Sequence, residues 1–257
     1  MFKFAITLKP NLSNGEELVN IIKSHFINLG NIYDEKDPDI IFACGGDGTL
    51  LTSIKNNMGK KCSYMMINAG TLGFFREYDL DELDKFFAEF DYDKLQYEEH
   101  NFLEISDIYG NKTLACNEFI WASPISTLDL NIFINHSYFM TVKGSGICIS
   151  SPFGSTGYNH SLGGSLLVGN LGFVLSLIAP IRNKAIHPLI NSLVLQNEDE
   201  ITIEMRNKVE CYISADMKPL PNLKGSKFTI KKSDVTFKLA HSTSFDNYTR
   251  IRRSFVD

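Results

Sequence analysis

An uninterrupted apolar segment that leads directly into a glycine-rich loop restricts the fold of this chain more than any other feature. Residues Ile40–Cys44 are all apolar, and the sequence Gly-Gly-Asp-Gly-Thr follows at residues 45–49. A continuous apolar run is typical of a strand that is buried on both faces of a parallel sheet. Consecutive glycines allow the backbone to turn sharply, and we expect a helix from Thr49. The segment therefore predicts the strand–loop–helix unit of an α/β fold.

The first 96 residues repeat this alternation of strand and helix. Phe2–Leu8 has the pattern of a buried strand. Ser13 and Glu16 have the spacing of a capping box at the start of an amphipathic helix, and a further helix is expected from Asp79. We therefore predict a parallel, right-handed, Rossmann-like α/β domain over residues 1–96.

From residue 97 onward the pattern changes to short strands separated by turns. It predicts an antiparallel, all-β domain over residues 97–241. Within it, residues 144–172 contain eight of the eighteen glycines, which favours loops whose backbone approaches a ligand closely. The final segment, Ser242–Phe255, carries arginines and is predicted to be helical. The strand candidates are residues 102–108, 113–121, 130–134, 138–142, 146–150, 193–196, 200–205, 209–214, 227–231 and 235–239.

Composition and charge exclude several classes of protein. The 257 residues carry 25 Lys and Arg against 30 Asp and Glu, and the net charge of −5 provides no broad basic surface for nucleic acid. None of the five cysteines forms a Cys-x-x-Cys pair, so neither a zinc site nor a disulfide framework is expected. No apolar segment has the length of a signal peptide or of a bilayer span. We expect a cytoplasmic protein with no membrane partner.

The aspartate inside the glycine-rich loop suggests a chemical role. The backbone N–H groups of such a loop, together with the start of a helix, favour phosphate binding. A carboxylate is repelled by phosphate, so Asp47 is useful there if it holds Mg²⁺ or accepts a proton from an attacking hydroxyl. The alternative is that Asp47 only caps the helix. The loop matches neither the P-loop nor the Gly-x-Gly-x-x-Gly pattern.

Three further segments offer polar groups to a ligand. The sequence Asn-Ala-Gly-Thr-Leu-Gly-Phe-Phe at residues 68–75 should lie beside the first loop, because neighbouring parallel strands end at the same edge of a sheet. Asn117 and Glu118 interrupt an apolar strand and need partners, which ribose hydroxyls could supply. Residues 152–164 combine hydroxyls, glycines and Tyr158, which suits a nucleotide base. The respective alternatives are a tight turn with packed aromatic rings, a structural salt bridge of Glu118, and an ordinary helix start.

Taken together, these four segments resemble the NAD kinase family, whose motifs occur here in the same order and at the same spacing. The resemblance runs from about Ile40 to the C-terminus. The glycine loop is shared with lipid kinases, whereas Asn117-Glu118 combined with Gly-Ser-Thr-x-Tyr at residues 154–158 is specific to NAD kinases. A lipid-type kinase and a non-catalytic dinucleotide-binding protein are the alternatives that we retain.

The resemblance implies transfer of a phosphoryl group to the 2′-hydroxyl of the adenosine ribose of NAD, which yields NADP. The donor would be ATP, or alternatively polyphosphate, and a divalent cation such as Mg²⁺ would offset the charge of the phosphates. The implied architecture is an N-terminal α/β domain, a β-rich domain with NAD bound between the two, and a C-terminal helix, about 242–257, that returns to the first domain. Family members are homodimers or homotetramers that build part of the NAD pocket across subunits.

The resemblance also implies roles for individual residues, with Asp47 orienting and deprotonating the ribose hydroxyl. The chain departs from the family pattern at Ser145, Phe153 and Gly157, and the departures at Ser145 and Phe153 leave the preference between NAD and NADH open. The donor range, the oligomer size and feedback by NADPH are open as well. The residues expected to bind phosphate or nucleotide are Gly45, Gly46, Gly48, Thr49, Gly70, Thr71, Gly73 and Phe74. Those expected to bind NAD are Asn117, Glu118, Lys143, Ser145, Ser155, Thr156, Gly157, Tyr158 and Ser161, and no metal ligand is assigned.

Overall fold

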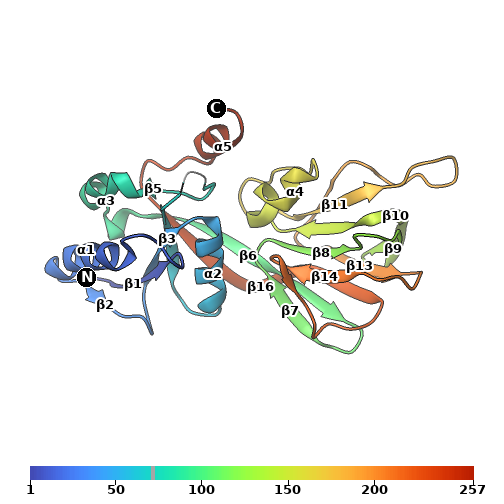
Figure 1. Ribbon diagram of the computed structural model, residues 1–257, viewed down its shortest axis with the longest axis horizontal. Coiled ribbons are helices and arrows are strands. Elements are labelled where there is room, and N and C mark those ends of the chain that lie inside the picture. Colours follow the sequence, from blue (N-terminus) through green and yellow to red (C-terminus); the bar gives the residue numbers. More distant parts are fainter. Residues whose placement is uncertain (71–72) are drawn as a thin grey trace. The chain divides into compact units, whose positions relative to one another are not determined.

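The strand predicted before the glycine-rich loop lies inside a parallel sheet in the computed structural model (Figure 1). The strands of this sheet are β1 (Lys3–Leu8), β2 (Ile32–Tyr33), β3 (Ile40–Gly45), β4 (Ser63–Asn68), β5 (Tyr78–Asp79) and the end of β16 (Lys227–His241). Every residue of β3 and of β4 is buried, as expected for strands covered on both faces. β3 pairs in parallel with β1 and with β4, and β16 adds a parallel strand beside β4.

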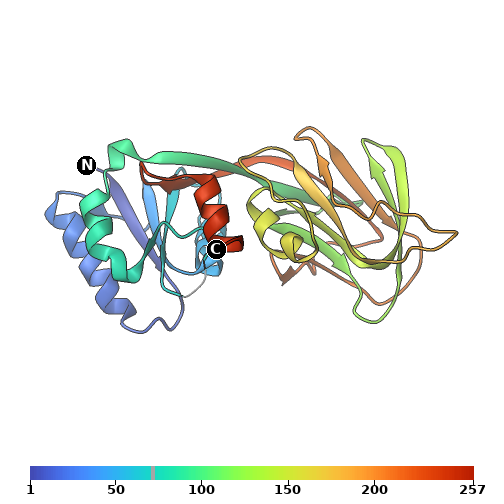
Figure 2. The same cartoon turned by 90° about the horizontal axis from the view of Figure 1, so that it is seen from above.

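Helices cover both faces of this sheet. The helices of this part of the chain are α1 (Gly15–Asn28), α2 (Asp47–Asn56), α3 (Leu83–Glu89) and α5 (Asn247–Phe255), with the 3₁₀ turns η1 (Leu80–Glu82) and η2 (Tyr92–Lys94), and the faces of the sheet are covered by α1, α2 and α3. The ring of Phe26 in α1 lies 5.4 Å from Phe4 of β1 and 5.8 Å from Phe86 of α3, and Figures 1 and 2 show α1 and α3 side by side. The hydroxyl of Thr7 in β1 instead bonds that of Ser53 in α2, at 2.9 Å. Successive residues of a strand point to opposite faces of the sheet, so Phe4 and Thr7 point to different faces. Helix α2 therefore covers the face opposite to that of α1 and α3.

The middle of the chain is built mainly from antiparallel strands. They are β6 (Gln96–Asp107), β7 (Lys112–Ala115), β8 (Glu118–Ala122), β9 (Leu128–Ile134), β10 (Ser137–Ser150), β11 (Phe173–Pro180), β12 (Leu193–Leu195), β13 (Glu200–Met205), β14 (Tyr212–Ala215), β15 (Lys218–Pro219) and most of β16. The hydrogen-bonded order β14, β8, β10, β9, β13, β16 is antiparallel throughout. Apolar residues that include Trp121, Ile147 and Phe228 form its core. The short helices η3 (Phe153–Thr156) and α4 (Tyr158–Ser161) follow β10.

Internal contacts divide the described residues, 1–70 and 73–257, into two units. Unit 1 consists of Met1–Glu99 and Phe237–Asp257, and unit 2 consists of His100–Thr236. The predicted fold class is confirmed: a parallel α/β part, a β-rich part, and a C-terminal helix that belongs with the first part. The nucleotide roles predicted for domains 1–96 and 97–241 stay predictions.

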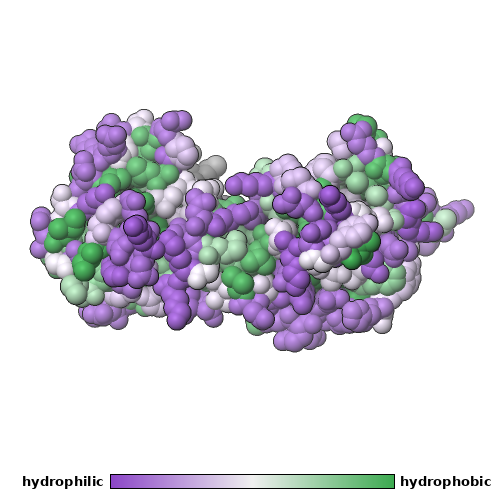
Figure 3. Space-filling view, turned by 90° about the horizontal axis from the view of Figure 1, so that it is seen from below, coloured by the Kyte–Doolittle hydropathy of each residue, from purple (hydrophilic) through white to green (hydrophobic). Residues whose placement is uncertain are grey.

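No helix within the described ranges is both long and apolar enough to cross a bilayer. On the face shown in Figure 3, polar residues cover most of the surface and apolar residues form scattered patches. Scattered exposed apolar residues are normal for a folded protein.

The sequence predicted one helix start correctly and another incorrectly. A helix follows Asp79 as predicted, and Asp79 and Glu82 form a reciprocal capping box there. The capping box predicted at Ser13 and Glu16 is wrong. Asn14 precedes α1 instead, in the left-handed conformation with φ of 58°, and its side chain makes no capping bond. Asparagine adopts this conformation more readily than most residues.

The carboxylate of Asp107 fixes a turn at the end of β6. It accepts hydrogen bonds from the backbone N–H groups of Tyr109, Asn111 and Lys224 and from the side chain of Asn111, at distances between 2.8 and 3.0 Å. Desolvation opposes ionisation, but these donors outweigh it and lower the pKa of Asp107 to about 2.

We expect the Asp107→Asn variant to unfold at a lower urea concentration than the wild-type protein at neutral pH. A carboxyl group whose pKa falls on folding stabilises the protein above its unfolded-state pKa of 3.8, and this contribution is lost as the pH falls towards 2. The difference in unfolding free energy between the two proteins should therefore shrink over this range, as measured by urea titration with circular dichroism. A difference that does not vary with pH would contradict the role given to the charge.

Candidate functional site

The first candidate group is the side chain of Asp47, the first residue of α2. Gly46 occupies the N-cap position, so the helix begins two residues before the predicted start at Thr49. Asp47 therefore lies inside the helix and is not its N-cap residue. Its Oδ2 and Oδ1 accept hydrogen bonds from the backbone N–H groups of Phe74 and Phe75, at 3.0 and 3.1 Å. The alternative in which Asp47 only caps the helix is therefore wrong.

The two glycine loops meet at the carboxyl ends of neighbouring strands, as predicted from the parallel topology. Gly45 of β3 is paired in register with Asn68 of β4. Asn68 Nδ2 donates to the carbonyl oxygen of Gly70 at 2.7 Å, and a Cβ atom on Gly73 would lie 3.0 Å from Asn68 Oδ1. Asn68 thus contacts the second loop on either side of Thr71, which was predicted to bind phosphate and lies outside the described residues.

The three glycines of the first loop differ in how much space surrounds them. A Cβ atom on Gly45 would lie 2.1 Å from the Oγ1 atom of the buried Thr49, so the protein's own packing requires glycine there. A Cβ atom on Gly46 or Gly48 would meet no described atom within 4 Å. The backbone is therefore open at these two positions, at the start of a helix, where the N–H groups and the helix dipole favour an anion.

Metal-ligating side chains do not gather around Asp47. In the part of the chain that the structure describes, no group of three or more His, Cys, Asp and Glu residues could hold a metal ion. A cation at Asp47 would therefore take most of its ligands from a bound phosphate compound and from water. Mg²⁺ commonly binds in this way, through one or two carboxylates and the oxygens of a phosphate.

In unit 2, Asn117 and Glu118 lie where the predicted strand 113–121 is interrupted. Asp216 forms hydrogen bonds with the backbone at this interruption. Its carboxylate accepts hydrogen bonds from the backbone N–H groups of Cys116, at 3.1 Å, and of Asn117, at 2.6 Å. Its own N–H donates to the carbonyl oxygen of Glu118 at 3.1 Å. Asp216 is buried and left-handed, with φ of 50°. This residue, to which the sequence analysis gave no role, fixes the backbone that carries the two candidate side chains.

The segment after β10 packs against the same backbone. A Cβ atom on Gly154 would lie only 2.2 Å from the carbonyl oxygen of Asn117. Glu118 is 2 % exposed, and its Oε2 lies 4.0 Å from the Cβ position of Gly157. Burial raises the pKa of Tyr158, and nearby groups that include Glu118 raise it further. Unit 2 therefore brings Asn117, Glu118, Gly157 and Tyr158 together, and their binding of NAD stays a prediction.

The predicted hydroxyl groups of this segment differ in their contacts. Ser155 is buried, and its hydroxyl donates to the carbonyl oxygen of Pro152 at 2.8 Å and accepts the N–H of Leu167 at 3.0 Å. Thr156 is half-buried and Ser161 is exposed. Ser155 therefore supports the loop, whereas Thr156 and Ser161 are accessible to a ligand.

Lys143 and Ser145 lie away from this group within the same chain. Ser150 of β10 pairs with Glu118, and Ser145 is five residues earlier in the strand, about 17 Å away in extended conformation. Lys143 lies further still and forms an ion pair with Asp129, with 3.3 Å between Nζ and Oδ2. These two predicted NAD ligands do not reach Asn117 and Glu118 within unit 2.

Comparisons with known proteins agree on one family. Residues 117–242 match the model of the ATP-NAD kinase C-terminal domain. An NAD kinase of Geobacillus stearothermophilus is 30% identical over 262 residues, with 98% of this chain and 96% of that protein covered. NAD kinase 1 of Halalkalibacterium halodurans is 28% identical over 256 residues, with 95% and 97% covered.

Two solved structures have the same fold. The yeast NADH kinase complexed with NADH superposes with a TM-score of 0.80 at 21% identity, covering 100% of this chain and 88% of that one. An NAD kinase from Archaeoglobus fulgidus in complex with ATP superposes with a TM-score of 0.72 at 23% identity, covering 98% and 97%.

The contact between Gly154 and Asn117 predicts a clear difference between two glycine substitutions. Gly154→Ala should lower the unfolding free energy by roughly 1–3 kcal/mol, because a methyl group cannot fit against the Asn117 carbonyl oxygen without a backbone shift. Gly157→Ala is the matched control and should cost less, since its Cβ atom would lie 3.3 Å from the nearest atom, the carbonyl oxygen of Gly154. Urea denaturation measures both. Equal stability of Gly154→Ala and the wild-type protein would contradict the packing described.

Proposed function

This chain belongs to the NAD kinase family, and we propose that it transfers a phosphoryl group from ATP to the 2′-hydroxyl of the adenosine ribose of NAD, producing NADP. The observation that carries this proposal is the Asp47 carboxylate, held by two backbone N–H groups beside an open glycine loop. A carboxylate repels phosphate, so its position favours participation in a reaction over passive nucleotide binding.

We assign to Asp47 the orientation and deprotonation of the attacking hydroxyl. Each carboxylate oxygen accepts one N–H, which fixes the rotation of the carboxylate, and each keeps acceptor capacity for another donor. The ribose hydroxyl would give its proton to Asp47 as its oxygen bonds to the γ-phosphorus, and ADP would leave with the electron pair of the broken bond. Positioning and electrostatics supply most of the rate enhancement in such transfers.

We propose that residues 1–96, completed by about 242–257, bind the phosphates of the donor. The open backbone at Gly46 and Gly48 and the N-terminus of α2 support this assignment, and Gly45, Thr49, Gly70, Thr71, Gly73 and Phe74 complete the proposed site. Asp47 and the phosphate oxygens together suit a divalent cation that prefers oxygen ligands, such as Mg²⁺. When bound, this cation would offset the charge of the phosphates. Polyphosphate is the alternative donor.

We propose that residues 97–241 bind the dinucleotide, chiefly through Asn117, Glu118, Thr156 and Tyr158, with Gly157 and Ser161 beside them and Ser155 supporting the loop. Lys143 and Ser145 are too far along β10 to join this group in one chain. Their separation supports a pocket that a second copy of the chain completes, in a homodimer or homotetramer.

Replacing Asp47 with asparagine should lower NADP formation from NAD and Mg²⁺-ATP by about 10²–10⁴-fold, the usual contribution of a positioned base. NAD should still bind, which calorimetric titration measures. Asp81→Asn, which alters an exposed carboxylate in η1, is the control and should keep full activity. Equal turnover by Asp47→Asn and the wild-type enzyme would remove Asp47 from its assigned role.

The same assay separates the alternatives when NADH or a diacylglycerol replaces NAD. Comparing the rates of phosphorylation of NAD and NADH would determine which of the two the enzyme prefers, the question that Ser145 and Phe153 leave open. Phosphorylation of the lipid alone would favour the lipid-type kinase. Binding of NAD without any phosphorylated product would favour a non-catalytic dinucleotide-binding protein.

Two substitutions in the first loop should separate ligand binding from folding. In Gly48→Ala the new methyl group enters open space within α2, where alanine is favoured over glycine by up to about 1 kcal/mol, so the melting temperature should hold or rise. ATP should nevertheless bind more weakly, because the methyl group takes space that we assign to a phosphate. Gly45→Ala should lower the melting temperature, because its Cβ atom would collide with Thr49. Unchanged affinity of Gly48→Ala for ATP would contradict the phosphate site.

A further inference from the structure

Helix α5 contacts the two residues that hold Asp47. The guanidinium of Arg250 lies 4.8 Å from the ring centre of Phe74 and 5.3 Å from that of Phe75. The ring of Phe255, also in α5, lies 5.7 Å from the ring of Phe74. Because the backbone N–H groups of Phe74 and Phe75 are the donors to Asp47, the position of the carboxylate depends on how these rings are packed.

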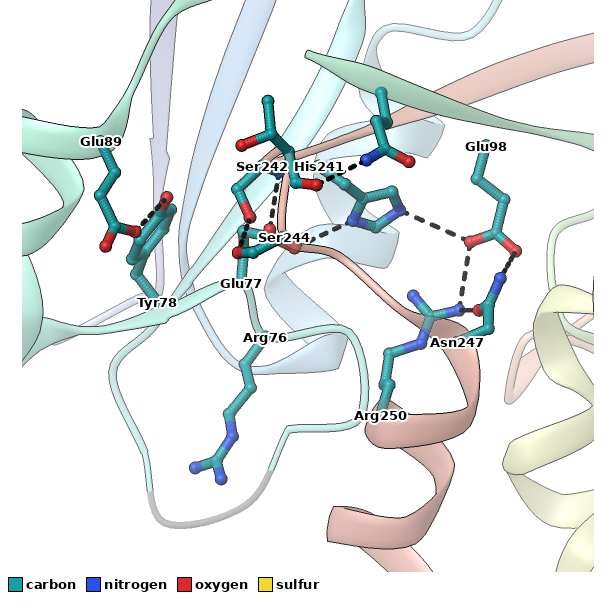
Figure 4. Close-up of polar contacts among 12 residues, drawn as sticks. Arg76, Glu77, Tyr78, Glu89, Glu98, His241, Ser242, Ser244, Asn247 and Arg250 are labelled. Carbon is teal, nitrogen blue, oxygen red and sulfur yellow. Dashed lines mark hydrogen bonds and ion pairs between the residues drawn. The ribbon is translucent and has the colours of Figure 1, made fainter. Parts of the chain in front are cut away.

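Arg250 is itself held by fixed partners. It is 7 % exposed, and its Nη2 atom donates to Glu98 Oε2 at 3.1 Å and to the side chain of Asn247 (Figure 4). Its other guanidinium nitrogens, Nε and Nη1, are buried with no hydrogen-bond partner among the residues that the structure describes. The guanidinium is therefore fixed by one ion pair and by aromatic faces, which include that of Phe245 at 4.9 Å.

A chain of polar contacts leads from Glu98 back to the loop of Phe74 and Phe75. Glu98 Oε2 lies 3.5 Å from His241 Nε2, and His241 Nδ1 lies 3.0 Å from Glu77 Oε2 (Figure 4). Glu77 Oε1 accepts the backbone N–H of Ser242 at 2.7 Å. Glu77 is two residues after Phe75. The contacts of Glu77 therefore hold the C-terminal end of the loop that carries Phe74 and Phe75, while Arg250 holds the two rings.

The charges of this cluster balance when His241 is protonated. His241 is 2 % exposed, and burial lowers its pKa, but the carboxylates of Glu77 and Glu98 outweigh this effect and raise it. The cluster then contains two cations, His241 and Arg250, and two carboxylates. A buried ion pair contributes little net stability, so a balanced cluster at this place points to the fixing of one conformation.

We propose that Arg250 is a positioning residue for Asp47: anchored by Glu98, His241 and Glu77, it keeps the backbone N–H groups of Phe74 and Phe75 against the carboxylate. The inference rests on the proposed phosphoryl transfer, in which Asp47 receives the proton of the ribose hydroxyl. Arg250 touches no reacting atom in this role. A displacement of the carboxylate by about 1 Å is enough to slow such a reaction by roughly 10²-fold.

The test is a double-mutant cycle between Arg250 and Asp47. Arg250→Met should lower kcat for NADP formation by about 10- to 100-fold and change KM for NAD by less than about threefold. In the Asp47→Asn background the same substitution should lower kcat by less than about threefold further, because the group that it positions no longer acts. Arg252→Met, on an exposed side chain of the same helix, is the matched control and should keep wild-type kinetics.

Equal losses of kcat in the two backgrounds, or no loss in the wild-type background, overturn the inference. If Arg250→Met does not fold, Arg250→Lys replaces it in the cycle, because lysine keeps the charge beside Glu98 but has no planar guanidinium to lie over the rings. It should show a smaller loss with the same non-additivity, and additive losses overturn the inference here too. Absence of NADP formation by the wild-type enzyme would instead refute the proposed function itself.

Discussion

Two hydrogen bonds between the glycine loops, from the backbone N–H groups of Phe74 and Phe75 to the Asp47 carboxylate, are the interaction on which the candidate reaction centre depends. Bonds from N–H groups to a carboxylate are about twice as strong as neutral ones. They also show how the strand order determines the orientation of a candidate catalytic side chain. Because β3 and β4 are parallel and in register, with Gly45 paired to Asn68, the loop of one strand can orient the side chain carried by the other.

Buried strands and a buried arginine in unit 1 hold the two loops in this arrangement. The parallel strands are buried on both faces, so the ends of β3 and β4 have little freedom to separate. The rings of Phe74 and Phe75 contact the buried guanidinium of Arg250, which pairs with Glu98 of β6, and Glu98 in turn contacts His241 at the end of β16. The candidate site of unit 2 is built on the same principle, because the buried Asp216 holds the backbone of Asn117 while leaving the asparagine side chain for other contacts.

The sequence predicted those features whose cause is local. The apolar run Ile40–Cys44, the change of pattern near residue 97 and the helix after Asp79 all depend on neighbouring residues, and all three appear in the structure. The capping box at Ser13 failed for a local reason too, since nothing in the spacing shows that Asn14 adopts a left-handed conformation. The strand predicted at 113–121 is broken between Ala115 and Glu118, at the place where Asn117 and Glu118 interrupt its apolar residues.

The contacts that hold the candidate site were not predictable in this way. The partners of Asp47 are 27 and 28 residues away, Asp216 is 99 residues from Asn117, and His241 is 164 residues from Glu77. The parallel pattern placed the two glycine loops at one edge of the sheet, but it specified neither the atoms that pair there nor the strands that bring Asp216 to Asn117 and His241 to Glu77. The sequence therefore indicated which residues carry the chemistry, but not which residues hold them.

The division of unit 1 into two stretches of sequence has a consequence for the order of folding. During synthesis Met1–Glu99 leaves the ribosome first, yet Phe237–Asp257, which supplies a parallel partner of β4 and all of α5, follows only after the whole of unit 2. Unit 2 is continuous and has its own core, so it can fold while unit 1 still lacks a strand and a helix. On a nascent chain, the loop that holds Asp47 is thus among the last regions to gain its full set of contacts.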